Sequence, residues 1–267
     1  MKKIWKVGMT VGVTAMCITG STLWASADSE DEAIKEAFIE SQNAAQQIGH
    51  FESDNGKTDQ LSEEQIQGYI DDFNAKMDRY YSSENGCRQI YKETNEQYLR
   101  KNAKDTVMYT VDGGVLSCAT ENIKLRADGK TATMHVVYVD WGNWVEQNES
   151  GQIEVTAPTG QTSADVTMVK EDGQWKLRAI NDMTVCFGAD AIFDLQRAEQ
   201  KASAKGQYIY SAEQQEQMQV FDEYEQKTIG TEYDSFSEAL KAAESIDPNE
   251  VNPFPLWNEM GGYSLEE

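Results

Sequence analysis

The chain has few of the residues that build common metal and redox centres. Its 267 residues include four cysteines, four prolines and two histidines. No CxxC motif occurs, which argues against a thiol oxidoreductase or a thiolate zinc site. The histidines, His50 and His135, lack the HxH or HxxxH spacing of imidazole metal sites. The sequence therefore predicts neither a metal site nor a cofactor.

Motifs for nucleophilic catalysis and phosphate binding are missing as well. The chain contains no G-x-S-x-G motif, no S-x-x-K motif with its partner motifs and no glycine-rich Walker loop. These absences argue against the common serine hydrolases and nucleotide-binding enzymes. Nothing in the sequence names a substrate.

Positive charge is scarce. The chain has 23 lysines and arginines against 46 aspartates and glutamates. Three of the lysines lie within the first six residues, so residues 28–267 carry a net charge of −26. Such a surface repels nucleic acid and anionic lipid headgroups, and neither is expected as a partner.

Residues 1–27 have the pattern of a secretory signal. Lysines precede 21 uncharged residues, and Ala25 and Ala27 form a small-residue cleavage motif. Threonines and glycines dilute the apolar run, which disfavours a permanent membrane anchor. Cys17 is a poor lipoprotein acceptor because Met16, not a small residue, precedes it. We expect cleavage after Ala27, no stable membrane insertion afterwards, and a secreted or extracytoplasmic protein.

Hydrophobic periodicity predicts helices first and strands afterwards. Spacings of three and four residues predict helices over 30–47, 62–80 and 87–101. Alternating and β-branched residues predict strands over 106–111, 114–126, 131–146, 152–156, 163–170 and 174–183. Turn residues at 112–114, 127–130, 148–151 and 171–174 favour sequential antiparallel connections.

The C-terminal region has a different character. Helical patterns recur over 189–205, 212–227 and 236–245, an extended stretch follows over 246–257, and acids dominate from residue 212 onward. We therefore expect a signal peptide at 1–27, an α+β domain at 28–187, and a helical, acidic C-terminal extension at 188–267. Phe254, Leu256 and Trp257 are expected to form a docking segment in that extension.

This order of elements, ending in Val169-Lys-Glu-Asp-Gly-Gln-Trp-Lys-Leu177, resembles the nuclear-transport-factor-2-like or polyketide-cyclase-like (SnoaL-like) cone fold. The resemblance covers about residues 28–187 and implies N-terminal helices packed on a curved antiparallel sheet around a pocket. It does not imply a reaction, because such folds include enzymes, binding modules and scaffolds. It also implies a possible homodimer formed through the open face of the sheet.

The strand over 131–146 carries the candidate catalytic residues. Tyr138 and Asp140 share one face, and His135 lies on the other. A carboxylate beside a tyrosine donor in a pocket could transfer protons, with His135 or Tyr109 assisting. A structural interpretation is open too, since Asp140 could cap its own backbone and Tyr138 could be a core residue.

Aromatic residues indicate a ligand site, and the remaining cysteines leave a disulfide open. Tyr138, Trp141 and Trp144 cluster along one strand and could stack on a ligand, or pack in the core. After signal removal three cysteines remain, and their spacing does not choose among three pairings. One pairing joins Cys118 to Cys186 and leaves Cys87 free.

Together these features favour an exported, non-enzymatic module of the bacterial cell envelope or extracellular space. It would bind a small molecule or an envelope protein. The alternative is a small-molecule isomerase, dehydratase or hydrolase that uses Asp140 with Tyr138 or His135.

Overall fold

The computed structural model describes residues 27–105, 107–187, 219, 223 and 230–250. Helices come first and an antiparallel sheet follows, so the chain has the α+β architecture that its sequence predicts. Of the predicted signal peptide, only Ala27 lies within the described residues. No helix in the described ranges is both long and apolar enough to cross a membrane.

The N-terminal helices agree closely with the predicted ranges: α1 (Ala27–Ala45), α2 (Glu63–Tyr80), α3 (Gly86–Gln97), a π-helical turn (Tyr98–Asn102) and α4 (Ala103–Asp105). Local capping explains where α2 and α3 begin. The Ser62 hydroxyl accepts the N–H of Gln65, whose side chain accepts the N–H of Ser62, as in a capping box. The Asn85 side chain accepts two N–H groups of the first turn of α3.

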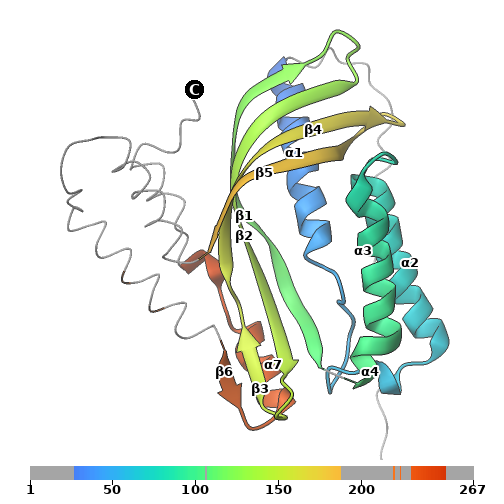
Figure 1. Cartoon of the computed structure of the whole chain (residues 1–267), viewed down its shortest axis with the longest axis vertical. Helices are drawn as coiled ribbons and strands as arrows, with labels where there is room; N and C mark the ends of the chain where they lie inside the picture. Colours follow the sequence, from blue (N-terminus) through green and yellow to red (C-terminus); the bar gives the residue numbers. More distant parts are fainter. Residues whose placement is uncertain (1–26, 106, 188–218, 220–222, 224–229, 251–267) are drawn as a thin grey trace, which may run out of the picture.

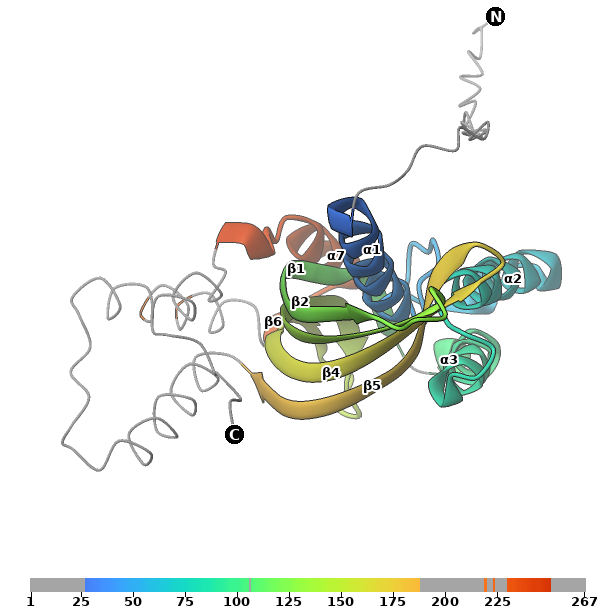
Figure 2. The ribbon, with the colours of Figure 1, turned by 90° about the horizontal axis from the view of Figure 1, so that it is seen from above.

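Within the described residues the sheet has six strands: β1 (Met108–Leu125), β2 (Thr131–Gln147), β3 (Ile153–Thr156), β4 (Thr159–Glu171), β5 (Gln174–Phe187) and β6 (Thr231–Tyr233). All neighbouring strands are antiparallel. β1 pairs along the whole of one edge of β2, whereas β4 and β3 share the other edge. Figure 2 shows β4 and β5 as curved ribbons, in keeping with the expected curved sheet.

Tight turns join most of the strands, as predicted. Asp172 and Gly173, between β4 and β5, have φ angles of 52° and 81°. Positive φ at both central residues defines the type I′ hairpin that Asp-Gly favours. β3 and β4 follow each other in the chain without pairing, because β3 pairs with β2 and β6.

The turn predicted at residues 112–114 is wrong. These residues lie inside β1, where the pairing with β2 shifts by one residue between Thr110 and Asp112. The Asp112 carboxylate accepts the N–H of Gly113 at 2.7 Å, a contact that serves a turn or a bulge equally well. Since β2 continues on both sides of this point, the extra residue is absorbed as a β-bulge.

Among the described residues, two large hydrophobic clusters and a small one around Val139 form the core. In the first, α1 and α2 contribute side chains such as Phe38 and Met77, which pack on Met134, Val136 and Tyr138 of β2. The second lies at the other end of the sheet, around a set of residues from several elements: Phe51, Ile66, Leu99, Tyr109, Val145, Val155 and Ala239. Figure 1 shows α1, α2 and α3 along one side of the sheet.

Part of the predicted C-terminal extension belongs to this domain. β6 extends the sheet beside β3, and α7 (Phe236–Glu244) packs at the lower end of the sheet (Figure 1). Ala239 and Ala243 of α7 are fully buried in the second cluster. The boundary expected at residue 187 therefore does not separate residues 231–250 from the domain. The helices predicted over 189–205 and 212–227, and the Phe254–Trp257 segment, lie outside the described residues, apart from residues 219 and 223.

Candidate functional site

The structure does not bring the four candidate catalytic residues together. Tyr138 and Asp140 lie on the face of β2 that meets α1, where Gln46 of the segment after α1 donates to Asp140 at 2.9 Å. His135 lies on the opposite face because side chains alternate along a strand. Tyr109 lies in the second hydrophobic cluster.

Tyr138 and Tyr109 are both core residues. The Tyr138 ring meets Phe38 edge to face, with centroids 5.4 Å apart. The Tyr109 ring packs in the same way against Phe51 and Phe236. Burial raises the pKa of the Tyr109 hydroxyl, so it stays protonated at neutral pH.

His135 instead belongs to a hydrogen-bonded chain that sequence reasoning missed. Its Nδ1 lies 3.0 Å from an oxygen of Asp165, and its Nε2 lies 3.2 Å from the hydroxyl of Ser163. This is the order of groups in a serine-hydrolase triad. However, β4 pairs with β2 and with β5, which engages its backbone N–H groups in the sheet. No sequence motif could reveal this chain, because the register between β2 and β4 creates it.

The three predicted stacking residues also do not form one cluster. Tyr138 and Trp144 lie on one face of β2, and Trp141 lies on the other. The Trp144 ring covers Gly142, where an added Cβ would come within 2.8 Å of the ring. Trp141 is 8% exposed and lines a surface groove. Of the three, Trp141 is therefore the one placed to touch a ligand in that groove.

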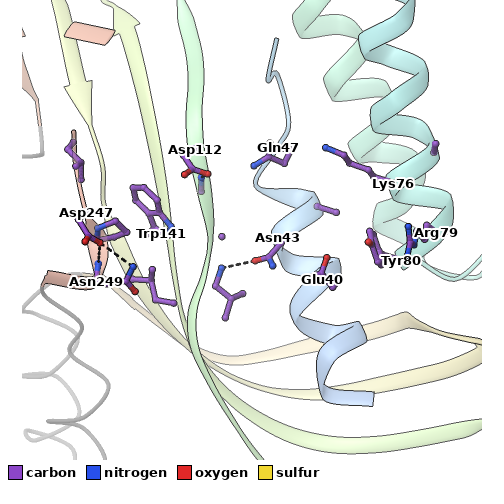
Figure 3. A pocket seen from close by; sticks show the side chains of 18 residues that line it. Glu40, Asn43, Gln47, Lys76, Arg79, Tyr80, Asp112, Trp141, Asp247 and Asn249 are labelled. Carbon is purple, nitrogen blue, oxygen red and sulfur yellow. Dashed lines mark hydrogen bonds between the residues drawn. The ribbon is translucent and has the colours of Figure 1, made fainter. Parts of the chain in front are cut away.

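The groove has a volume of about 850 Å³ and runs around the bulged part of β1. Figure 3 shows α1 and α2 along one side of it and Trp141 with residues 246–249 along the other. Lys76 and Arg79 of α2, together with Glu40 of α1, bring charges of both signs to one end. Asp247 brings negative charge to the other end, and Asp112 lies between the two ends (Figure 3).

Backbone groups of β1 in the groove are already bonded to side chains. The Asn43 amide oxygen on α1 accepts the N–H of Val115 at 2.8 Å (Figure 3). Gly114 allows this approach, because a Cβ there would lie 2.9 Å from the same oxygen. Asp112 likewise accepts the N–H of Gly113. These side chains block strand addition at this edge, so a ligand would be recognised mainly by side chains.

A smaller cavity of about 270 Å³ adjoins the groove, and both are lined by Asp112, Trp141 and Ile246. It lies between β1, β2 and α7, and Asn143 and Glu244 also line it. The Asn143 amide nitrogen donates to the carbonyl of Ala243 at 2.8 Å, which fixes α7 against β2. The Asn143 amide oxygen is buried and has no hydrogen-bond partner.

The structure does not pair Cys118 with Cys186. Cys118 of β1 is a free thiol, and Cys87 is free and exposed. Cys186 is on β5, and β2 and β4 separate β5 from β1. Strands lie about 4.8 Å apart, so three spacings exceed the Cα separation of about 7 Å that a disulfide tolerates. Among the described residues no cluster of histidine, cysteine and acidic side chains could hold a metal ion.

Comparisons with known proteins leave the family open. No protein-family model matches the chain, and no curated protein matches it. The crystal structure of the intermembrane space region of the chloroplast protein ARC6 matches with a TM-score of 0.33 and 11% sequence identity. That match covers 59% of this chain and 96% of the other. A similarity at this level supports no argument about fold or function.

Proposed function

We propose that the protein is exported and that its domain binds a small ligand in the groove between α1, α2, β1 and residues 246–249. The groove itself carries this proposal, because it is a concave surface that is lined by charged side chains of both signs and has Trp141 in its wall. Export is supported by the basic, apolar and small-residue pattern of residues 1–27. We also propose that the domain is related to the nuclear-transport-factor-2-like cone folds, because the motif at residues 169–177 resembles theirs.

The contacts of Asp140 favour binding over catalysis. A general base must reach the proton that it removes, but Gln46 occupies an oxygen of Asp140. The tyrosine beside it, Tyr138, is 6% exposed and packs on Phe38. A ligand in the groove meets Trp141 and the charged rim instead.

The test uses a substitution that fills the groove and leaves the core residues unchanged. Ala75 is exposed on α2 and lines the groove, so Ala75→Trp places a large ring inside it. Gly68→Trp is the matched control, because Gly68 is exposed on α2 two turns earlier and does not line the groove. A thermal-shift panel of amino acids, short peptides, amines and sugars identifies ligands. We expect Ala75→Trp to abolish the ligand-induced rise in Tm, and Gly68→Trp to retain it. Equal Tm shifts in both variants would refute the groove as the binding site.

One observation supports an enzymatic alternative, namely the chain from Ser163 through His135 to Asp165. A fluorophosphonate labels a serine that such a chain activates, and peptide mass spectrometry locates the label. We expect no label on Ser163, because β4 pairs with β2 on one side and with β5 on the other, which engages its backbone in the sheet and not in an oxyanion site. A label that disappears in His135→Gln would instead establish a hydrolase.

A further inference from the structure

The smaller cavity beside the groove is lined by aromatic rings, by aliphatic side chains and by side chains that carry hydrogen-bond acceptors. Its volume of about 270 Å³ exceeds that of an engineered cavity of about 150 Å³ that holds benzene. Trp141 and Tyr109 provide aromatic walls, and no lysine or arginine is among the described residues that line it. The cavity therefore has room for a small organic group and no basic side chain to attract an anion.

The amide oxygen of Asn143 is a hydrogen-bond acceptor to which no donor among the described residues bonds. The residue is 1% exposed, and its amide orientation follows from the bond between its nitrogen and the carbonyl of Ala243. Its oxygen is consequently left buried without a partner. Buried polar atoms of this kind are rare and call for an explanation such as a bound ligand or water.

His50 supplies a second acceptor. Its Nδ1 lies 3.0 Å from the carbonyl oxygen of Thr110. A carbonyl can only accept a hydrogen bond, so Nδ1 carries the proton in the neutral ring and Nε2 keeps its lone pair. Since His50 lines the cavity, the neutral ring adds an acceptor to that of Asn143.

Two exposed carboxylates and a helix end bring negative charge to the cavity. Asp112 pairs directly with Asn143 across β1 and β2, so the two side chains share a face. Glu244 is the last residue of α7, where the helix dipole is itself negative. An acid there disfavours the helix end but would attract a cation.

We propose that this cavity binds a primary ammonium group of the ligand that the groove holds. Asp112 and Glu244 balance its charge, while the Asn143 oxygen and the His50 Nε2 accept its N–H groups. The aromatic face of Trp141 adds a favourable contact with a cation. This inference rests on the proposed binding function and names the ligand class as amines, including the amino end of a peptide.

The experiment titrates the protein with n-butylammonium chloride and follows the Trp141 indole and Asn143 amide signals by NMR. Butyltrimethylammonium, butyrate and butanol are the comparison probes. We expect saturable binding of n-butylammonium only. Butyltrimethylammonium has the positive charge but no N–H donors, butyrate carries the opposite charge, and butanol is uncharged. Equal binding of butyltrimethylammonium would overturn the hydrogen-bonding part of the proposal. If n-butylammonium shifted neither NMR signal, the whole proposal would be overturned, and the cavity would hold water only.

Matched variants separate this inference from the proposed function. Asp112→Asn removes the charge but keeps an oxygen for the N–H of Gly113, and we expect about 10- to 100-fold weaker n-butylammonium binding. Asp72→Asn is the control, because Asp72 is exposed on α2 and lines neither the groove nor the smaller cavity. If a groove ligand is found and Asp112→Asn leaves amine binding unchanged, the ammonium site is refuted and the groove stands. If Ala75→Trp abolishes no ligand's binding, the proposed function fails instead.

Discussion

Replacing Phe236 with alanine tests whether α7 is an integral part of the domain. The Phe236 ring meets Tyr109 edge to face, with centroids 5.5 Å apart and an interplanar angle of 85°. It also rests on Gly56, where an added Cβ would come within 2.6 Å of the ring. This side chain thus joins α7 both to β1 and to the loop before α2.

These contacts determine how much stability Phe236→Ala should lose. Removing a fully buried phenylalanine side chain costs about 3–5 kcal/mol, and an aromatic pair adds about 0.5–1.5 kcal/mol. Phe236 is only partly buried, so we expect Phe236→Ala to lower the free energy of unfolding by about 2–3 kcal/mol. For a domain of this size that corresponds to a fall in Tm of roughly 4–12 °C.

Urea and thermal unfolding, followed by circular dichroism, measure this change. Ile90→Ala is the control, because Ile90 of α3 is 58% exposed and its loss should change stability by less than about 0.5 kcal/mol. If Phe236→Ala were as mild as Ile90→Ala, then α7 would not be docked on β1. The domain would in that case end near β5, as the sequence predicts.

Three further predictions concern single contacts. Gly142→Ala should lower the free energy of unfolding by about 1–3 kcal/mol in urea titrations, because its Cβ would collide with the Trp144 ring; an unchanged midpoint would contradict that packing. Burial raises the pKa of the Cys118 thiol to about 11, so iodoacetamide at pH 8 should alkylate exposed Cys87 first, as peptide mass spectrometry would show. A lysine of β4 donates a hydrogen bond to the Glu30 carboxylate and lowers its pKa. The resulting stabilisation of the folded state is fully present above the ordinary pKa of 4.5. It is lost as the pH falls through the lower pKa of the folded state. Acid titration should therefore narrow the stability difference between the protein and Glu30→Gln, and a constant difference would argue against this bond.

The local patterns were strong enough to predict the helices and most of the strands. Buried positions of α2 recur at helical spacing, and a capping box marks its start, so residues 62–80 were recognisable without tertiary information. Alternation along β2 assigned Tyr138 and His135 to opposite faces, as the structure has them. The Asp-Gly pair at residue 172 specified its hairpin because few other residues adopt two positive φ angles in succession.

Long-range pairing decided the rest. Asp112-Gly-Gly is compatible with a turn or a bulge, and only the continued pairing of β1 with β2 selects the bulge. The chain of His135, Ser163 and Asp165 exists only because of the register between β2 and β4.

The sequence by itself determined the element types, the side-chain faces and the acidic charge, because these depend on neighbours a few residues apart. Tertiary structure alone decided that α7 returns to the sheet and that its end carbonyl bonds to Asn143, 100 residues away. It also decided that Trp141 lines a groove with α1 and α2. Such contacts join segments whose separation in the chain leaves no periodic signal, so the binding groove could be seen only in the folded molecule.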